Sequence, residues 1–382
     1  MPSWYPSEAD PVGGVFVKEQ ADALATQYDV AVLISEMGSW RDSLKPNLKQ
    51  VSKTNTGSPV PVYRQSARPL IPHGPERIDY HTFERATHAG FKKLLAEFGK
   101  PDVIHAHVVL HAGWAALKLG QRYSIPVVLT EHSSPFSMHL DTQVKRDLVH
   151  KTLNGVNQVV AVGPGLAQQM KSFHPNLEEK IVGNLISTDF FVPSASNGHK
   201  RDTASPLRFF VAARLAEQKG LSYLLHAVAL LNKSEKRPFE LMLGGDGPER
   251  AQLEQLAADL GIAHLCKFLG GLDRAGVKDW MNRSDVFVLS SLHETFGVVV
   301  GEAMACGKPV VSTRCGGPEF IITDESGVLV DAANPESLAG AMSEFLNGRV
   351  SFDPSTIRRS VVERFGVEAF LRNITSVYEA VW

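Results

Sequence analysis

The sequence predicts an α/β protein built from two doubly wound domains. Short apolar runs rich in Val, Leu and Ile alternate with amphipathic helical segments along most of the chain, which is typical of parallel sheets covered by helices. The alternation stops between residues 192 and 206, where Pro, Ser, Asn and Gly dominate, and then restarts. A length of 382 residues exceeds one ordinary core and fits two domains of roughly 150–200 residues each.

Strands and helices alternate in the first half of the chain. The apolar runs that predict buried parallel strands span 29–34, 103–107, 126–130 and 158–162. Helices are predicted over 83–98, 112–122 and 142–154, with another beginning near Gly165. The chain opens in a loop-like segment, Met1 to Pro6, so either the first strand is very short or the numbering starts inside it.

The same alternation returns in the second half. Strands are predicted at 207–213, 239–244, 265–269, 285–290 and 309–313. Helices are predicted at 219–232, 248–260, 274–283, 297–306 and 335–347, and a last helix at about 366–381 closes the chain.

Composition excludes several classes of protein. A formal charge of −2 gives no basic field for nucleic acid, so no nucleic-acid partner is expected. Three cysteines without CxxC spacing argue against a disulfide framework or a zinc site and favour a reducing compartment. His105, His107 and His111 lie close together in sequence, but no cysteine or paired carboxylate joins them, so we expect no metal.

No signal peptide or membrane-spanning run is visible in the sequence. Residues 1–30 lack a basic start followed by an apolar stretch, and no apolar run approaches the ~20 residues of a membrane helix. We therefore expect a cytoplasmic protein, with a place at the inner face of the plasma membrane left open.

The stretch from Ser290 to Gly317 carries the strongest chemical signal. A strand ends at Ser290-Ser291, a loop carries Glu294, and a helix begins at about Phe296-Gly297. Free N–H groups at a helix start bind anions, and ligands of doubly wound sheets lie just past the strand ends. Glu302 follows in a helix that is apolar nearly all round, so it needs a partner. Taken singly, Glu294 could instead be an exposed loop residue and Glu302 a solvated helix residue.

Other clusters follow other predicted strands. Arg214 and Lys219, in RLAEQKG, are cations at the mouth of the sheet that suit a diphosphate, although two solvated surface cations would look the same. Gly244-Gly245 lies in a GGDGPE turn, and Gly13-Gly14 opens a helix where amides could approach a phosphate. Neither GxGxxG nor GxxxxGK[ST] occurs, which removes the main support for a dinucleotide-binding protein or a P-loop protein.

Together these segments resemble glycosyltransferase family 4, retaining enzymes of the GT-B fold, over nearly the whole chain. The most specific part is the glutamate pair Glu294-TFGVVVG-Glu302, followed by GKPVVST and by GG-x-E at Gly316 to Glu319. RLAEQKG and GGDGPE upstream are equally typical. The resemblance implies two Rossmann-like domains facing each other across a cleft that holds the active site.

The resemblance also implies roles for the second-half residues. Arg214 and Lys219 look like the pair that neutralises the donor diphosphate, with Gly245 in the adjoining turn. Glu294 looks like the acid that hydrogen-bonds the donor sugar, with the Phe296 and Gly297 backbone beside it. Glu302 looks like the acid that holds the ribose hydroxyls. Leu272, after Gly270-Gly271, is a candidate for lining the base pocket.

In the first half, the resemblance implies that Gly14 meets the diphosphate and that His132, in TEHS, lies near the reacting sugar. A satisfied histidine at a strand end is the alternative for His132. The implied domains are residues 1–190, for the acceptor, with the last helix at about 366–382 joined to them, and 191–365 for the donor. The implied reaction is retaining, hexosyltransferase-type and metal-independent, since two cations can replace a metal, and it needs no cofactor.

The expected partners are a nucleotide-sugar donor and a glycan or lipid-linked acceptor of cell-envelope or exopolysaccharide biosynthesis. Residues 41–77 are rich in Lys and Arg and have few acids, which fits either a solvated insertion or a peripheral membrane contact. The alternative hypotheses are a nucleotide-sugar epimerase of the same fold, a degenerate non-catalytic protein that binds sugar nucleotides, and a two-domain sugar-binding protein. The donor base, donor sugar and linkage stay open.

Overall fold

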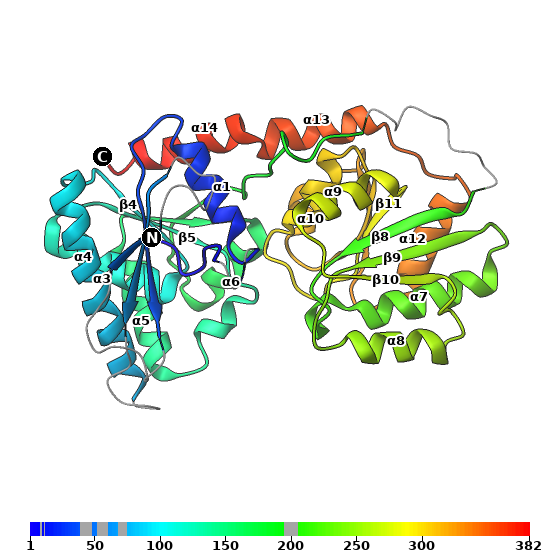
Figure 1. Cartoon of the computed structure of the whole chain (residues 1–382), viewed down its shortest axis with the longest axis horizontal. Coiled ribbons are helices and arrows are strands. Elements are labelled where there is room, and N and C mark those ends of the chain that lie inside the picture. The colour runs from blue at the N-terminus through cyan, green and yellow to red at the C-terminus, as the bar shows by residue number, and fades with distance from the viewer. Residues whose placement is uncertain (8–9, 11, 39–47, 52–59, 68–74, 195–204) are drawn as a thin grey trace. The chain divides into compact units, whose positions relative to one another are not determined.

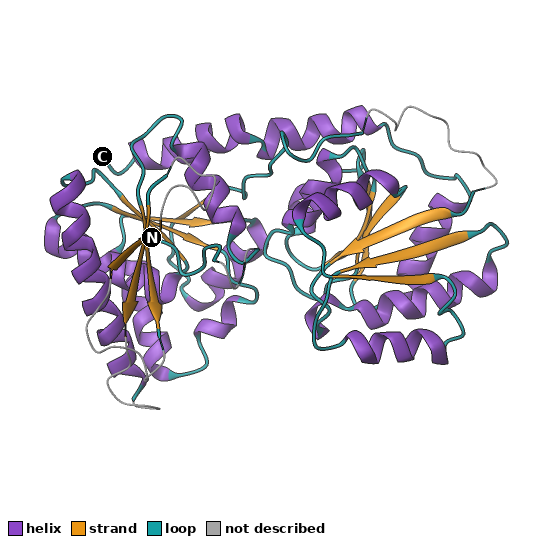
Figure 2. Ribbon diagram, in the orientation of Figure 1, coloured by secondary structure: helices purple, strands orange, loops and turns teal. Residues whose placement is uncertain are grey.

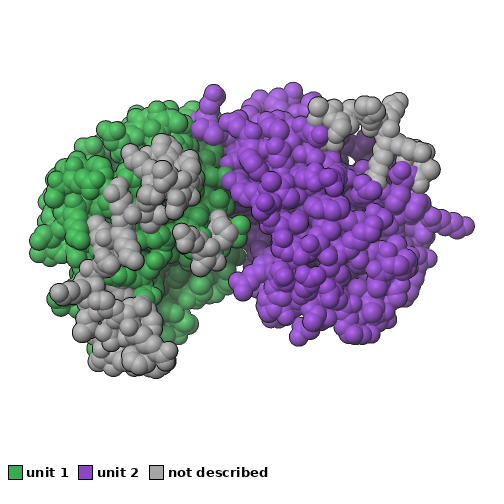
Figure 3. All heavy atoms as spheres, viewed as in Figure 1, with its two compact units in different colours: residues 1–185, 370–382 green, residues 186–369 purple. Residues whose placement is uncertain are grey.

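A computed structural model describes residues 1–7, 10, 12–38, 48–51, 60–67, 75–194 and 205–382. This part of the chain divides into two compact units, which Figure 3 colours separately. Unit 1 holds Met1–Leu185 together with Phe370–Trp382, and unit 2 holds Ile186–Ala369.

Unit 2 contains one six-stranded sheet in which every neighbouring pair of strands is parallel. Its strands are β8 (Leu207–Ala212), β9 (Phe239–Gly244), β10 (Cys266–Gly270), β11 (Val286–Leu289), β12 (Val310–Arg314) and β13 (Gly327–Asp331). They lie in the order β10-β9-β8-β11-β12-β13, which is the doubly wound order 3-2-1-4-5-6 (Figure 1). The helices are α7 (Leu221–Ser234), α8 (Arg250–Asp259), α9 (Arg274–Arg283), α10 (Val298–Ala305), α11 (Pro318–Ile321), α12 (Pro335–Leu346) and α13 (Pro354–Phe365).

Side-chain alternation explains why helices cover both faces of this sheet (Figure 2). Phe209 and Val211 of β8 join a buried cluster with α7, α8 and α12. Phe210 points to the other face, where its ring lies 6.4 Å from the ring of Trp280 on α9. Because successive side chains of a strand point to opposite faces, a near-continuous apolar run is needed to bury both.

Unit 1 contains two smaller sheets. In the first, β1 (Val32–Met37) pairs in parallel with β3 (Val62–Ala67), which pairs antiparallel with β2 (Leu48–Val51). The second is parallel, in the order β4 (Ile104–His107), β5 (Val127–Glu131), β6 (Gln158–Ala161) and β7 (Glu179–Ile181). The opening residues meet this second sheet through an isolated parallel bridge between Pro2 and His107.

The helices of unit 1 are α1 (Val15–Leu24), α3 (Glu76–Phe98), α4 (Trp114–Tyr123), α5 (Gln143–Gly155) and α6 (Pro164–Phe173). The last helix of the chain, α14 (Val367–Glu379), contributes its final turns to the same unit. There the Tyr378 hydroxyl lies 2.7 Å from Nδ1 of His105, and the Tyr28 hydroxyl lies 2.9 Å from the Thr375 hydroxyl.

The predicted α/β class is confirmed, and most predicted elements occur within a few residues of their expected limits. The helix expected at 83–98 begins earlier, at Glu76, because Tyr80 and Phe83 already bury its first turns. Among the described elements, the sequence did not predict several that are short or polar, including β2, β3, β7, β13, α11 and α13.

Candidate functional site

The candidate donor site lies where the strand order of unit 2 reverses. The chain leaves β8 for α7 and leaves β11 for α10, and these adjacent strands lie at the centre of the sheet. Ligands of doubly wound sheets bind at such a switch point, outside the carboxyl ends of the strands. Both loops carry residues that the sequence singled out, namely Arg214 and Lys219 after β8 and Glu294 to Gly297 after β11.

The two loops are fastened to each other by backbone contacts. The Leu292 N–H donates to the Gln218 carbonyl at 2.8 Å, and the Ser290 hydroxyl donates to the Lys219 carbonyl at 2.9 Å. Gly220 has a φ of 59°, and a Cβ there would lie only 2.2 Å from the Ser290 carbonyl oxygen. This close contact between the two loop backbones therefore requires glycine at position 220, and it holds the backbone of the neighbouring Lys219 in place.

Lys219 and Glu294 form an ion pair in this site. Lys219 Nζ lies 2.6 Å from Glu294 Oε1, which also accepts a hydrogen bond of 2.8 Å from the Ser291 hydroxyl. The two side chains keep only 23% and 13% of their exposure, so the pair is partly shielded from water. The structure thus brings together two residues that the sequence assigned to neighbouring parts of one donor.

Arg214 is the second residue after β8 and is exposed. It forms no hydrogen bond or ion pair with another residue in the described part of the chain. Its backbone is nevertheless held, because Ala213 N–H donates to the Gly244 carbonyl and Leu215 N–H donates to the Asp246 carbonyl, both at 3.0 Å. A fixed loop with an unpaired guanidinium is suited to an anionic ligand.

Gly245 has a structural reason to be glycine. Its φ is 137°, and a Cβ there would lie 1.8 Å from the Ala213 carbonyl oxygen. The turn after β9 therefore packs its backbone directly against the loop that carries Arg214. In this structure Gly245 supports that loop, and its role in donor binding remains a prediction.

Phe296 and Gly297 present backbone to the site. The Phe296 ring is 1% exposed and packs at 5.3 Å from the ring of Phe365, so its side chain belongs to the core. Gly297, with a φ of 90°, caps the start of α10. The α10 N-terminus therefore offers amide N–H groups close to Glu294, as an anion or a sugar hydroxyl would require.

Glu302 lies on α10 and has the partner that its buried helix requires. Nη2 of Arg274 lies 3.9 Å from Glu302 Oε1, and the two side chains keep 29% and 14% of their exposure. Leu272, two residues before Arg274, is half-buried and packs close to Gly244. Sequence reasoning missed Arg274. The signal for it was the need of Glu302 for a cation, but nothing in the sequence says that α9 supplies one.

Gly14 and His132 belong to unit 1. Gly14 has a φ of 70° and caps the start of α1, and a Cβ there would lie 2.5 Å from the Trp4 carbonyl. His132 follows β5 and is 6% exposed. Its Nε2 lies 3.0 Å from His107 Nδ1.

The rings of His105, His107 and His132 are stacked in a row. Neighbouring ring centroids lie 4.3 and 5.2 Å apart. Burial lowers the pKa of His105 to about 3 and that of His132 to about 4, and it also lowers the pKa of His107. All three imidazoles are therefore neutral at pH 7, so His132 meets any ligand as an uncharged group.

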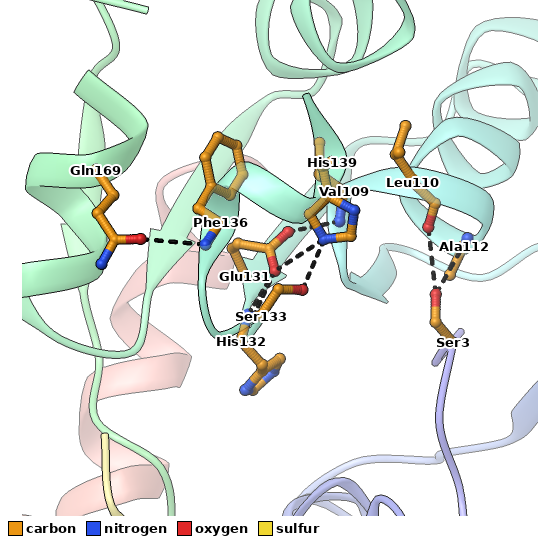
Figure 4. A network of polar contacts seen from close by, with 10 residues as sticks. All are labelled: Ser3, Val109, Leu110, Ala112, Glu131, His132, Ser133, Phe136, His139 and Gln169. Carbon is orange, nitrogen blue, oxygen red and sulfur yellow. Dashed lines mark hydrogen bonds and ion pairs between the residues drawn. The ribbon is translucent and has the colours of Figure 1, made fainter. Parts of the chain in front are cut away.

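Glu131, next to His132, organises the loops at this edge of unit 1 (Figure 4). Its side chain is fully buried and accepts hydrogen bonds of 2.7, 2.8 and 2.7 Å from the N–H groups of Val109, His132 and Ser133. The Ser133 hydroxyl lies 2.7 Å from His139 Nε2, which lies 3.9 Å from Glu131. Glu131 was not among the predicted site residues, although it directly follows the predicted strand 126–130.

The remaining sequence predictions concern metals and membranes. Among the described residues, no three His, Cys, Asp or Glu side chains are gathered so that they could hold a metal ion. Within the same residues, no helix combines the length and the apolar character needed to cross a membrane. Of the basic residues in 41–77, Arg64 pairs with Glu36 and Arg77 lies 3.6 Å from Asp147. The others, Arg41, Lys45, Lys53 and Arg68, and the side chain of Lys49, lie outside what the structure describes.

Comparison with known proteins identifies the family. Residues 13–189 match the family described as Glycosyltransferase Family 4, and residues 197–360 match Glycosyl transferases group 1. An uncharacterized glycosyltransferase of Methanocaldococcus jannaschii is 33% identical over 300 residues, which are 73% of this chain and 75% of that protein. The chain belongs to glycosyltransferase family 4. The resemblance seen in the sequence motifs is thereby confirmed.

This family 4 glycosyltransferase is also similar to two further proteins. It is 35% identical over 190 residues to the lipopolysaccharide core biosynthesis glycosyltransferase LpsE of Rhizobium meliloti. That match covers 49% of this chain and about half, 53%, of LpsE. The crystal structure of Anabaena HepE in complex with UDP has a TM-score of 0.74 at 20% identity, covering 96% of both chains. The GT-B fold that the resemblance implied is confirmed.

Proposed function

We propose that this chain is a retaining hexosyltransferase that transfers a sugar from a UDP-sugar to a glycan or lipid-linked glycan of the cell envelope. HepE, a structural neighbour, was crystallised with UDP, which supports the choice of donor base. The relative LpsE acts in lipopolysaccharide core biosynthesis, which supports the choice of acceptor. A lipid-linked acceptor would place the reaction at the cytoplasmic face of the plasma membrane.

The observation that carries the proposal is the Lys219–Glu294 pair at the switch point of unit 2, with the exposed Arg214 on the same loop as Lys219. A nucleotide sugar brings a diphosphate and a sugar with several hydroxyls to one place. The diphosphate requires cations, and the hydroxyls require acceptors such as a carboxylate. Arg214 and Lys219 would bind the diphosphate, and Glu294 would bind the sugar.

When the donor binds, Lys219 would be shared between Glu294 and the diphosphate. Its ammonium group has three N–H donors, and one of them bonds Glu294. Arg214 would add the planar fork that suits phosphate oxygens. The Gly297 end of α10 would direct its N–H groups at the same anion, and Glu302 would accept hydrogen bonds from the ribose.

These groups fit the charge that develops during transfer. As the bond to the donor sugar breaks, an oxocarbenium-like centre forms and negative charge builds on the diphosphate. Preorganised cations and amides stabilise that charge without a metal ion. The leaving phosphate would then help to deprotonate the acceptor on the same face of the sugar, so the anomeric configuration is retained. The residues of unit 1, Gly14 and the neutral His132, would contact the diphosphate and the reacting sugar.

Product formation from defined donors tests the proposal. The purified protein is incubated with UDP-, GDP- and ADP-hexoses, a core-lipopolysaccharide or glycolipid fraction and EDTA, and labelled product and free nucleotide are quantified. We expect acceptor-dependent release of UDP that EDTA does not change. Arg214→Ala and Lys219→Ala should each lower the rate by about 100-fold or more. Lys267→Ala, which removes an exposed cation on β10, is the matched control.

Two results would contradict the proposal. Full activity in Lys219→Ala would show that the pair does not serve the donor. Conversion of the donor into another nucleotide sugar without an acceptor would instead indicate an epimerase.

A further inference from the structure

A cation occupies an unfavourable position at the start of α9. Arg274 is the first residue of this helix, and Asp273 caps it by accepting a hydrogen bond of 2.7 Å from the Gly276 N–H. The start of a helix carries partial positive charge, which disfavours a cation there. Other contacts must therefore hold the Arg274 guanidinium in place.

Those contacts are aromatic rings on one side and a carboxylate on the other. The guanidinium carbon lies 4.9 Å from the centre of the Phe190 ring and 5.3 Å from that of Phe191. Nη2 lies 3.9 Å from Oε1 of Glu302 on α10. Arginine stacks on aromatic faces and is more weakly hydrated than lysine, so it suits this partly enclosed place.

Of the two rings, Phe191 is held in a fixed position. Phe191 is 1% exposed, its N–H donates to the Ser187 carbonyl at 2.9 Å, and its carbonyl accepts 2.8 Å from Arg358 Nη1. A planar guanidinium that rests on a fixed ring has little rotational freedom. The direction from which it attracts Glu302 is therefore also fixed.

The chain segment that carries Arg274 also carries Leu272, which the resemblance makes a candidate for lining the base pocket. Leu272 precedes Arg274 by two residues and packs near Gly244, the last residue of β9, next to the turn that supports the Arg214 loop. Glu302 keeps 14% of its exposure, so a ligand reaches it at a limited part of its surface. A carboxylate that must accept hydrogen bonds from two neighbouring hydroxyls needs one defined orientation.

We propose that Arg274 is a positioning residue for ribose recognition, holding the Glu302 carboxylate in the orientation that accepts hydrogen bonds from the 2′- and 3′-hydroxyls of a ribonucleoside diphosphate. This inference rests on the proposed function, because the ribose role of Glu302 is part of it. Arg274 itself acts through Glu302 and need not touch the nucleotide.

Discrimination between ribose and deoxyribose tests this inference. Dissociation constants of UDP and 2′-deoxy-UDP are measured by calorimetry for the full-length protein, with the GDP and ADP pairs in parallel. The variants are Arg274→Met, Arg274→Lys, Glu302→Gln and the double variant Arg274→Met/Glu302→Gln. Arg283→Met is the matched control, because Arg283 lies in the last turn of the same helix and pairs with Asp279.

We expect the wild-type protein to bind the ribonucleotide about tenfold more tightly than its deoxy form, as for hydrogen bonds to a charged group. Arg274→Met should reduce that ratio to about threefold or less, mainly by weakening the binding of the ribonucleotide. Arg274→Lys should restore part of the ratio. The double variant should bind no more weakly than Glu302→Gln alone, and Arg283→Met should match the wild-type protein.

Several outcomes would overturn the inference, and they are distinguishable. If Arg274→Met weakens the binding of both nucleotides equally, so that the ratio of their dissociation constants is unchanged, Arg274 does not position Glu302. If the two single substitutions add independently, the residues are not coupled. If Arg274→Met fails to fold, the ratio in Arg274→Lys decides, and an unchanged ratio contradicts the inference. Absence of nucleotide binding in the wild-type protein would instead reject the proposed function itself.

Discussion

At the scale of single residues, the site depends on charged groups whose partners are supplied by other loops. Lys219 meets Glu294 from the neighbouring strand, and Glu302 meets Arg274 from another helix. Glu131 is the extreme case, because its fully buried carboxylate is satisfied by three N–H groups from two loops. A buried charge is stable only when such donors are already in place.

We predict that Glu131→Gln destabilises unit 1. An amide has one acceptor oxygen, and its NH₂ group would face N–H groups that now donate to the carboxylate, so the free energy of unfolding should fall by about 3 kcal/mol. Hydrogen exchange of peptides from unit 1, read by mass spectrometry in increasing urea, measures this loss. Glu178→Gln, at an exposed position, should change stability by less than about 0.5 kcal/mol. Equal stability of the two variants would show that the carboxylate is not needed.

The residues of the candidate site that could be proposed from the sequence are those whose chemistry is visible in their own segment. Glu294 and Glu302 were identifiable because their spacing is characteristic, and Arg214 and Lys219 because they follow a strand. Arg274 and Glu131 were not, because their importance comes from contacts between segments far apart in sequence. The interaction of His132 with His107 was hidden for the same reason.

At the scale of elements, the buried strands of unit 2 could be predicted because they are nearly continuous apolar runs. The strand expected at 285–290 is β11, Val286–Leu289, whose residues are all buried. The edge strand β13 was missed because three of its five residues are only half-buried and its apolar run is short. In unit 1, β3 contains the adjacent polar residues Arg64 and Gln65, which interrupt its apolar pattern and hide the strand.

Close backbone approaches in the loops lead to a second prediction. A methyl group at Gly245 would lie 1.8 Å from the Ala213 carbonyl oxygen, at a φ of 137° that L-residues rarely adopt. Gly245→Ala should therefore destabilise unit 2 by about 2–3 kcal/mol and displace the Arg214 loop. Thermal unfolding and nucleotide binding, measured together, test both consequences.

Gly340→Ala is the matched control for that substitution. Gly340 lies on α12, is exposed, and has nothing within 4 Å of its Cβ position. The change should stabilise the protein by about 0.5–1 kcal/mol, because alanine favours a helix more than glycine does. If Gly245→Ala behaves like Gly340→Ala, the packing described for the turn after β9 is wrong.

At the scale of the whole molecule, the two units differ in the titratable groups whose pKa is shifted. Burial lowers the pKa of His105 to about 3 and the pKa values of His111 and His132 to about 4, and all three lie in unit 1. In unit 2, hydrogen bonds from Ser355 and Thr356 lower the pKa of Asp353 to about 2. That carboxyl titrates at a more acidic pH than the histidines do.

We predict that mild acid weakens unit 1 before unit 2. An unfolded histidine has a pKa of about 6.5, so below that pH the unfolded state binds more protons than the folded state. The stability that the neutral histidines provide is complete above about pH 6.5 and is lost as the pH falls towards 4. At pH 5.5, each of the three histidines should lower the free energy of unfolding by about 1.4 kcal/mol. Hydrogen exchange at pH 7.5 and 5.5, corrected for intrinsic rates, should show selective loss of protection in unit 1. Equal loss in both units would contradict this.

The central claim is that unit 2 binds a nucleoside diphosphate at the switch point of its sheet without a metal ion. Thermal stabilisation by UDP, GDP and ADP, with magnesium or with EDTA, tests it most directly in the wild-type protein and Arg214→Ala. At about 100 times its dissociation constant, a bound nucleotide should add about 2.7 kcal/mol of stability. We predict a clear shift with UDP that EDTA leaves unchanged and that Arg214→Ala loses. No shift with any nucleotide in folded protein, or a shift that requires magnesium, would contradict the account.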